Sequence, residues 1–548
     1  MKTWIILFLS ALVLSVGLVR ADAPTSDEIK KLKDEIEDLE DRLNEVEKKS
    51  VMDRLSFYGD YRFEASSIDG SVPDHYDGMV LQNLMIGTMF YYGATGQFPM
   101  GTGDVQNFIA TNYADWLYFT NNLTFDQLYS MMSLFPPEMQ QQLMMMLLPD
   151  AYRQGYDYSN DIIYTNRLRL SFKADVAKDI EFSGRLSMYK AWGDSTGVQV
   201  FNGQPTSMNI DGTTTQVPNS DILRVERAYF SWKNIFGSPL YLSIGRRPSS
   251  SGPPMHLREG EMRGGTPLGL AVEYQYDGLT LGYSFLDHHS TFRLCYGVGF
   301  ESGFGQAAEL KSPADRLEDV HMGGINWDIY QDESMLVQTT IMRAFDVTDG
   351  FNGLVVMPVN PLTGESVNAP VVMRYTPSAN LGNIDLAGFM VLRRDGPVDW
   401  FINYGYMKSH PDPITTPFGG LFSDPFEVPE SQTGHAYYAG LRYNFSNEKT
   451  MLGLEFNHGS EYWFNFAQGA DDLVSPKLST RGDVYEAYIL HQPNKHVLLK
   501  LDYMRYDYDY SGSGWHVGAP KKLDETPILG FATFDEVDVL SFSLITRF

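Results

Sequence analysis

Charged side chains alternate with apolar ones in several segments of this 548-residue chain. This pattern favours a role in attracting and orienting charged or dipolar solutes over a role in covalent catalysis. The basic residues of the first such segments are Arg62, Arg167, Arg169, Lys173 and Arg185. The acidic candidates are Asp60, Glu64, Glu181, Glu273, Glu455 and Asp502. Two facing walls of opposite charge would create a transverse field that orients dipolar solutes and tunes ion preference. The alternative is that each arginine pairs with a neighbouring acid and that these pairs only keep the interior hydrated.

Motifs for covalent or metal chemistry do not accompany these charges. The His-Glu-x-x-His and phosphate-loop patterns are absent. Cys295 is the single cysteine, which excludes an internal disulfide and cysteine-rich metal sites. The formal net charge of −27 argues against nucleic acid as a partner, because phosphates need concentrated lysine and arginine. Acidic pairs such as Asp471-Asp472 read as solvated loop charge, with calcium binding as the alternative. We therefore expect a protein that is not an enzyme and that uses no cofactor or metal.

The segments that position these charges read as β-strands from Phe57 onward. In residues 167–174, Leu168, Leu170 and Phe172 fall on one face, while arginine, serine and lysine fall on the other. Similar segments of about nine to fourteen residues recur along the chain, as in strands that cross a bilayer at a tilt. The predicted fold class is all-β, a transmembrane antiparallel β-barrel with a short N-terminal coiled-coil helix.

Connection lengths predict about 16 strands. Short turns are expected near residues 177–179, 234–238, 277–278, 330–334, 394–397, 446–449 and 492–495. Long polar loops are expected at 67–162, 191–220, 248–267, 287–317, 346–380, 409–434, 460–481 and 509–534. Seven short turns that alternate with eight long loops join sixteen strands, although fourteen or eighteen remain open. Residues 293–301 also alternate, but a strand there breaks this parity, so we place them inside the fourth loop.

The two ends of the chain carry signals of export. Residues 1–21 read as a signal peptide, with Lys2 before an apolar run and cleavage after Ala21. At the other end, the chain stops at Phe548 on an alternating strand. This ending looks like the last strand of Gram-negative outer-membrane proteins, whose terminal aromatic residue is read by the barrel-assembly machinery. We therefore expect residues 53–548 to form an outer-membrane barrel.

Residues 22–52 predict a periplasmic coiled-coil helix. Its heptad positions are Ile29, Leu32, Ile36, Leu39, Leu43 and Val46, spaced three and four apart. Such a stripe needs a partner to bury it, because three heptads alone are marginal as an isolated helix. A homotrimer is the favoured interpretation, and a helix folded onto its own barrel is the alternative.

The first long loop, residues 67–162, contains a methionine-rich stretch from Met131 to Tyr152. Two short helices separated at Pro136-Pro137 would present an apolar face that cannot lie bare in water. The segment could fold back into the barrel as a plug. It could instead pack against another protomer or a surface partner, since methionine-rich surfaces adapt to partners.

Two neighbouring strand-like segments carry a resemblance to a known family. "ERAYFSW", Glu226 to Trp232, is followed by "LYLSIGRRP", Leu240 to Pro248. The pair resembles strands common in porin families, and the whole layout resembles Gram-negative outer-membrane porins with an N-terminal coiled coil. The resemblance implies passive diffusion of ions and small hydrophilic solutes through a barrel held in outer-membrane lipid. The alternative function is a plugged barrel that acts as an adhesin, a tether or a sheath for a partner.

Overall fold

The computed structural model describes Lys33 and residues 54–133, 135–193, 199–200, 218, 220–303, 312, 316–350, 353–359, 366–375, 377–467 and 471–548. The chain divides into two compact units, Met1–Ser56 and Phe57–Phe548, and the second contains the features below. The expected signal peptide and the six heptad residues lie outside the described residues. Both therefore stay predictions.

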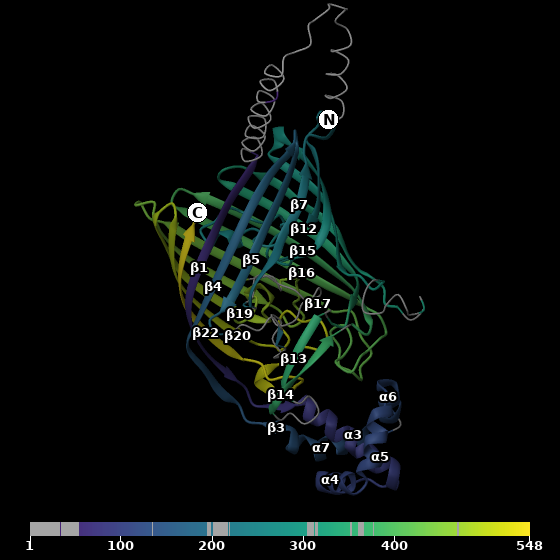
Figure 1. Ribbon diagram of the computed structural model, residues 1–548. Coiled ribbons are helices and arrows are strands. Elements are labelled where there is room, and N and C mark those ends of the chain that lie inside the picture. The colour runs from purple at the N-terminus through teal and green to yellow at the C-terminus, as the bar shows by residue number, and fades with distance from the viewer. Residues whose placement is uncertain are drawn as a thin grey trace, which may run out of the picture. The chain divides into compact units, whose positions relative to one another are not determined.

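Sixteen antiparallel strands close into one barrel (Figure 1), which confirms the predicted all-β barrel and its strand count. The strands are β1 (Leu55–Val72), β4 (Tyr156–Ala177), β5 (Ile180–Ala191), β7 (Ser220–Trp232), β8 (Leu240–Arg246), β9 (Asp277–Phe285), β10 (Ser290–Phe300), β11 (Val320–Gln331), β12 (Met335–Thr348), β15 (Asn380–Asp395), β16 (Val398–Pro411), β17 (Thr433–Asn444), β18 (Thr450–Gly459), β19 (Gly482–Asn494), β20 (Val497–Tyr508) and β22 (Glu536–Arg547). Neighbours in the chain are neighbours in the barrel, and β22 pairs with β1. Phe548 extends this seam, since its amide donates to the carbonyl of Gly59 and its carbonyl accepts from the Gly59 amide.

The predicted strand count is right, but it rests on two errors that cancel. Residues 293–301, which we placed in a loop, lie mostly in β10. The short turn expected at 277–278 does not exist, because Asp277 already belongs to β9 and the turn that follows is Leu286–His289. The residues just before Asp277 alternate between apolar and polar types as a strand does, but they form no strand of the barrel wall. The other six predicted short turns lie where the structure has them.

The outer face of the barrel is apolar and the inner face is largely polar. On β20, Leu501 and Tyr503 point outward and are 47% and 42% exposed, while Lys500 and Asp502 point inward and are each 5% exposed. On β19, Tyr485 and Ile489 lie outside and Glu486 lies inside. A soluble barrel has the opposite arrangement, so the outer face of this barrel needs a lipid environment.

The long segment between β1 and β4 is mainly helical. It contains β2 (His75–Asp77), α3 (Gly78–Thr95), α4 (Thr102–Thr111), α5 (Tyr113–Asn122), α6 (Phe125–Ser133), α7 (Pro137–Ala151) and β3 (Tyr152–Arg153). Asp77 caps α3, because its carboxylate accepts from the amides of Met79 and Val80 at 3.1 and 3.0 Å. The apolar side chains pack on one another in two clusters, one around Leu143 and Leu147 and one around Met89. The structure thus does not place this methionine-rich stretch in the lumen core described below.

Short strands outside the barrel form two small sheets. One contains β6 (Gln199–Val200), β13 (Gly353–Val359) and β14 (Ser366–Tyr375). The other pairs β2 with β3 and with β21 (Ile528–Leu529). The helical segment is therefore joined by backbone pairing to the connection that follows β20.

Candidate functional site

Two connections fold into the barrel instead of away from it. Residues 247–276 join β8 to β9, and residues 460–481 join β18 to β19; we call them the two lumen segments. They meet at a parallel bridge between Val272 and Phe466, where the Glu273 amide donates to the Phe466 carbonyl at 2.6 Å. The candidate site is the set of contacts by which these segments occupy the lumen.

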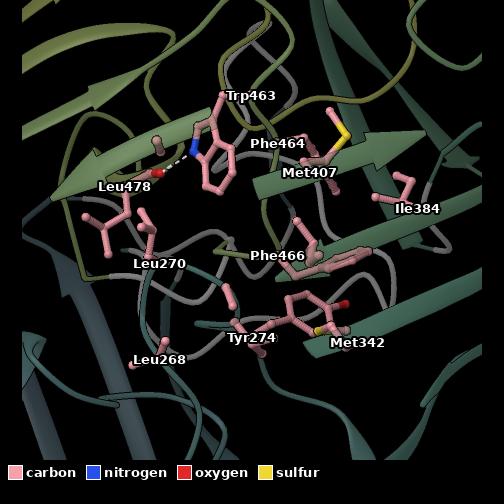
Figure 2. Close-up of a cluster of buried hydrophobic side chains, with 14 of the residues drawn as sticks. Leu268, Leu270, Tyr274, Met342, Ile384, Met407, Trp463, Phe464, Phe466 and Leu478 are labelled. Carbon is pink, nitrogen blue, oxygen red and sulfur yellow. Dashed lines mark hydrogen bonds between the residues drawn. The ribbon is translucent and has the colours of Figure 1, made fainter. Parts of the chain in front are cut away.

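One side of the lumen is filled by an apolar core (Figure 2). Leu270, Trp463 and Phe466 of the lumen segments are at most 1% exposed. They pack with inward-facing side chains of the strands, which include Met342, Ile384, Met407 and Tyr438. The Trp463 indole donates to the Leu478 carbonyl at 2.8 Å. Gly405 on β16 permits this packing, since a Cβ there would come within 2.5 Å of the Trp463 ring.

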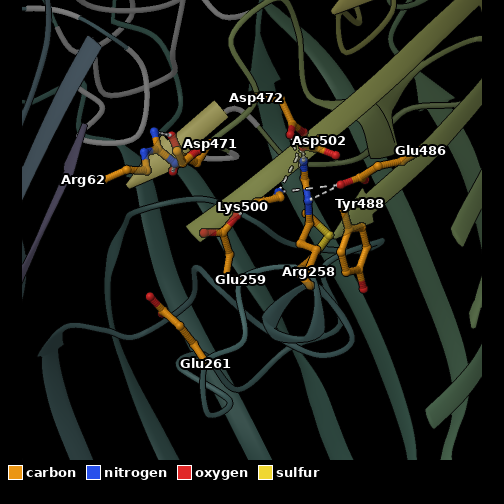
Figure 3. A network of polar contacts seen from close by, with 12 residues as sticks. Arg62, Arg258, Glu259, Glu261, Asp471, Asp472, Glu486, Tyr488, Lys500 and Asp502 are labelled. Atoms are coloured by element: carbon orange, nitrogen blue, oxygen red, sulfur yellow. Dashed lines mark hydrogen bonds and ion pairs between the residues drawn. The ribbon is translucent and has the colours of Figure 1, made fainter. Parts of the chain in front are cut away.

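The other side of the lumen is charged, and Arg258 lies at its centre (Figure 3). This side chain is 5% exposed and comes from the first lumen segment. It donates to Asp472 of the second segment at 2.7 Å and to Glu486 of β19 at 3.0 Å. Burial alone lowers the pKa of Arg258, but the carboxylates of Asp472 and Glu486 outweigh it and raise the pKa well above its ordinary value. One guanidinium thus ties both lumen segments to the wall.

Two lysines extend the charged side. Lys477 of the second lumen segment is 1% exposed and lies 2.5 Å from Glu455 on β18. It also pairs with Glu486, so three cations share that carboxylate when Lys500 is included at 3.8 Å. Lys500 on β20 pairs with Asp502 at 3.0 Å and with Glu259 at 3.5 Å. Buried charges in such a network satisfy one another, and removal of one leaves its partners uncompensated.

The predicted basic residues on β1 and β4 also bind lumen-segment carboxylates. Arg62 donates to Asp471 at 2.6 Å, and Arg167 pairs with the same carboxylate. Arg169 donates to Asp60 at 2.7 Å and to Glu261 at 2.5 Å. Burial raises the pKa of Asp471 despite these two arginines. The interpretation in which each arginine pairs with an acid fits these contacts better than a bare arginine wall.

The other predicted charged residues form three pairs, two on inward faces of the barrel and one near a short turn. Glu64 lies beside Arg62 at 3.7 Å, and Arg185 pairs with Glu226 at 3.1 Å. Lys173 and Glu181 lie 3.8 Å apart near a short turn, and Lys173 is 49% exposed, so this pair is remote from the lumen segments. Lys173 and Glu181 thus lie toward the turn end of the barrel. The other predicted residues on barrel strands lie on inward faces: Arg62, Arg167, Arg169, Arg185, Asp60, Glu64, Glu455 and Asp502.

Glu273 belongs to a lumen segment and not to a barrel strand. Its carboxylate accepts from the Ser251 amide at 2.5 Å and is 3% exposed. Burial raises the pKa of Glu273 to about 8, although the backbone donors and Arg227 oppose the shift. The expectation that residues before Asp277 form a strand of the barrel wall was wrong, because they alternate in polarity but lie inside the lumen.

Sequence reasoning missed the residues that hold the segments in place: Arg258, Asp472, Lys477 and Glu486. Asp471 and Asp472 are not solvated loop charge, since each is engaged by a buried arginine. A signal was present in residues 462–467, Tyr-Trp-Phe-Asn-Phe-Ala, which is too apolar for a loop exposed to water. The same holds for residues 268–272.

A small cavity of about 40 Å³, lined largely by charged residues, remains on the charged side. Arg167, Arg169, Glu226, His256 and Glu273 are among the residues that line it. Burial lowers the pKa of His256 to about 4, and nearby arginines act in the same direction. The charged side therefore keeps room for water or ions, whereas the apolar side is packed.

Chemistry beyond ion pairing has little support in the described residues. Among them, no group of three or more His, Cys, Asp or Glu could hold a metal ion. No helix among these residues is both long enough and apolar enough to cross a membrane. Cys295 faces inward on β10 and accepts from the Thr280 hydroxyl at 3.4 Å. A Gly-x-Ser-x-Gly pattern at residues 193–197 follows β5, and most of it lies outside the described residues.

Comparison with known proteins gives a family. No curated protein matches the chain. Solved structures with some likeness include OmpT of Vibrio cholerae (10% identity, 90% of this chain and 97% of that chain, TM-score 0.38) and OprB of Pseudomonas putida (10%, 91% and 96%, TM-score 0.37). OmpF of Salmonella typhi gives 9% identity, 90% and 97% coverage, and a TM-score of 0.40. These are loose similarities, and the barrel rests on its own strand pairings. A family model described as "Protein of unknown function (DUF3373)" matches residues 157–548, so this chain belongs to that family.

Proposed function

We propose that this protein is a porin-like channel of the Gram-negative outer membrane whose passage is narrowed by the two lumen segments. The observation that carries the proposal is a closed barrel with an apolar outside and a charged inside, tied to those segments through Arg258. The apolar outside supports residence in lipid. In the proposed orientation, the short turns and the N-terminal helix lie on the periplasmic side of the membrane. The long connections lie on the extracellular side.

The path for solutes follows the charged side of the lumen. The apolar core offers ions no charged groups, whereas the small cavity beside Arg167 and Arg169 is lined by charged side chains. Only ions and small hydrophilic solutes fit such a path. Because the arginines there are paired with carboxylates, we expect the acidity of the chain to set selectivity and to favour cations.

Single-channel conductance in a planar bilayer tests this proposal. The full chain should give small, stable steps, and the reversal potential in a salt gradient should show cation preference. Replacement of residues 461–480 by a short glycine-serine turn should raise the conductance several-fold. Deletion of residues 78–151 is the matched control and should leave the conductance unchanged, since that segment contributes nothing to the lumen core. The opposite ranking of the two deletions contradicts the proposal.

A second candidate function is a barrel with a structural or binding role and no conductance. The packed apolar core favours it, because Trp463, Phe464 and Phe466 fill the lumen as a protein interior is filled. Folded, heat-modifiable protein that gives no current at any voltage would establish this alternative over the channel. Anion preference would instead refute the selectivity argument alone.

Assembly is proposed from the two ends of the chain. The heptad residues from Ile29 to Val46 support a homotrimer, and Phe548 supports recognition by the barrel-assembly machinery. Phe548 is 62% exposed and pairs with Gly59 at the seam between β1 and β22. Phe548→Ser should lower the amount of assembled barrel in cells, while Phe285→Ser at a turn end should have less effect. Equal loss in both variants speaks against a terminal recognition signal.

A further inference from the structure

The helical segment between β1 and β4 has an unusual surface. Helix α5 (Tyr113–Asn122) has no buried residue. Tyr113, Leu117 and Tyr118 are 58%, 42% and 74% exposed; Tyr113 and Leu117 lie one turn apart on the same side of the helix, and Tyr118 lies further round it. Its other aromatic residues, Trp116 and Phe119, pack on Phe90 and attach the helix to α3. One face of α5 is therefore built into the segment. The exposed part carries Tyr113, Leu117 and Tyr118, which we call the apolar face, beside the polar Asp115 and Asn121.

The helices of this segment, α3 to α7, contain no lysine or arginine. Arg62 and Arg153 bracket a stretch, residues 63–152, that contains no lysine or arginine. From β2 to α7 its acids are Asp77, Asp104, Asp115, Asp126, Glu138 and Asp150. Four of them, including Asp115 on α5 and Asp126 on α6, are exposed. A partner that covers the apolar face of α5 would therefore meet negative charge around it.

The acidic surface continues onto a neighbouring loop. Phe125 and Tyr129 of α6 stack on Phe426, with ring centroids 5.9 and 6.1 Å apart. Phe426 lies in residues 412–432, which contain four acids and again no lysine or arginine. Lys521 pairs with Asp424, but the other acids of these two segments leave a negative balance beside the exposed rings of Tyr129 and Phe426.

We propose that the apolar face of α5 is a docking site for a basic amphipathic segment of another protein. Apolar side chains of the partner would cover Tyr113, Leu117 and Tyr118, and its lysines or arginines would face the acids around them. Burial supplies affinity and the opposite charges steer encounter and orientation. A second copy of this chain would bring like charge to the same place, and an anionic lipid surface would be repelled. The inference rests on the proposed outer-membrane orientation, which exposes this segment outside the cell, but not on conductance.

The test uses the full chain in nanodiscs of zwitterionic lipid, with empty nanodiscs as the background. The probe is a fluorescent leucine–lysine helix of about 18 residues, or five turns, and the matched probe replaces lysine by glutamate. We expect the basic probe to bind at least roughly tenfold more tightly than the acidic one. The preference should shrink between about 0.05 and 0.5 M salt, because screening weakens exposed charges. Equal binding of the two probes overturns the proposal.

Variants locate the site. The triple change Tyr113→Ser, Leu117→Ser, Tyr118→Ser touches only exposed side chains and should weaken the basic probe by at least roughly tenfold. Asp115→Lys should weaken it by a smaller factor, and Glu333→Lys, at an exposed short turn, should not. Unchanged conductance in the triple variant shows that the channel is intact. If the triple variant binds as the parent does, α5 is not the site. If the parent instead binds anionic vesicles or pairs with itself through these residues, a lipid or a second copy replaces the proposed partner.

Discussion

Arg258→Ala is the most informative single change, because one side chain joins both lumen segments to the wall. The guanidinium is 5% exposed, and its partners Asp472 and Glu486 are 0% and 1% exposed. Removal of one member of a buried ion pair costs about 3–5 kcal/mol, since the other charge stays buried without compensation. Lys477 still serves Glu486, and its amide still donates to Asp472, so we expect the lower end, about 3 kcal/mol.

A loss of this size is roughly a hundredfold in the folding equilibrium. The assay is reversible urea unfolding of the barrel in lipid vesicles, followed by tryptophan fluorescence. Trp463 lies in the lumen core and contributes to this signal as one of the eight tryptophans of the chain. Arg258→Lys should give an intermediate value, because lysine keeps the charge but cannot form both directed bonds.

Arg505→Ala is the matched control. Arg505 faces three acids, Asp507 at 2.8 Å, Glu536 at 2.7 Å and Asp538 at 3.4 Å, but it is 35% exposed. Arg505 lies three residues from the end of β20 that leads into the long connection, where water screens such pairs, so its loss should cost about 0–1 kcal/mol. If Arg258→Ala destabilises the barrel no more than Arg505→Ala does, burial does not govern the strength of these contacts and the reasoning fails.

Three further predictions concern the core, the pH response and assembly. Trp463→Ala should cost about 3–5 kcal/mol in the same unfolding assay, and a loss below about 1 kcal/mol would show that the lumen core is loosely packed. Glu273 has a pKa raised to about 8, so the native state keeps a proton that the unfolded chain releases above its ordinary pKa of 4.5. The free energy of unfolding should therefore fall as the pH rises from 4.5 to 8, and a Glu273→Gln variant with the same slope would disprove the assignment. Removal of residues 22–51 should convert a trimer to a monomer in detergent, as measured by mass, and a trimer that persists would show that the helix is not the assembly device.

The sequence predicts the wall of this barrel much better than its contents. Alternation with a period of two is a local property, so the inward faces of β1 and β4, with Arg62 and Arg167, could be assigned from the residues alone. The same property misled us before Asp277, because an extended segment buried in the lumen alternates as a strand does. Short turns were found because their length is local too.

What enters the lumen could not be predicted in the same way. The entry of residues 247–276 and 460–481 depends on contacts with distant strands, such as Arg258 with Glu486 and Lys477 with Glu455. Methionine content drew attention to residues 131–152, yet most of those methionines pack against α3 within the helical segment, and Met145 stays 60% exposed. Consecutive apolar residues in a loop show that the loop must be buried, but not where.

The lumen network also has a consequence for the order of folding. Arg258 contacts residues 214 to 246 positions away, and each of its partners comes from the last third of the chain. Contacts between such distant residues form slowly, because a long loop must close before they stabilise anything. The first lumen segment therefore stays unpaired while the wall is still open. The interior of this barrel is therefore completed late, after strands β18 to β20 have taken their places, and until then Arg258 and its carboxylates remain hydrated.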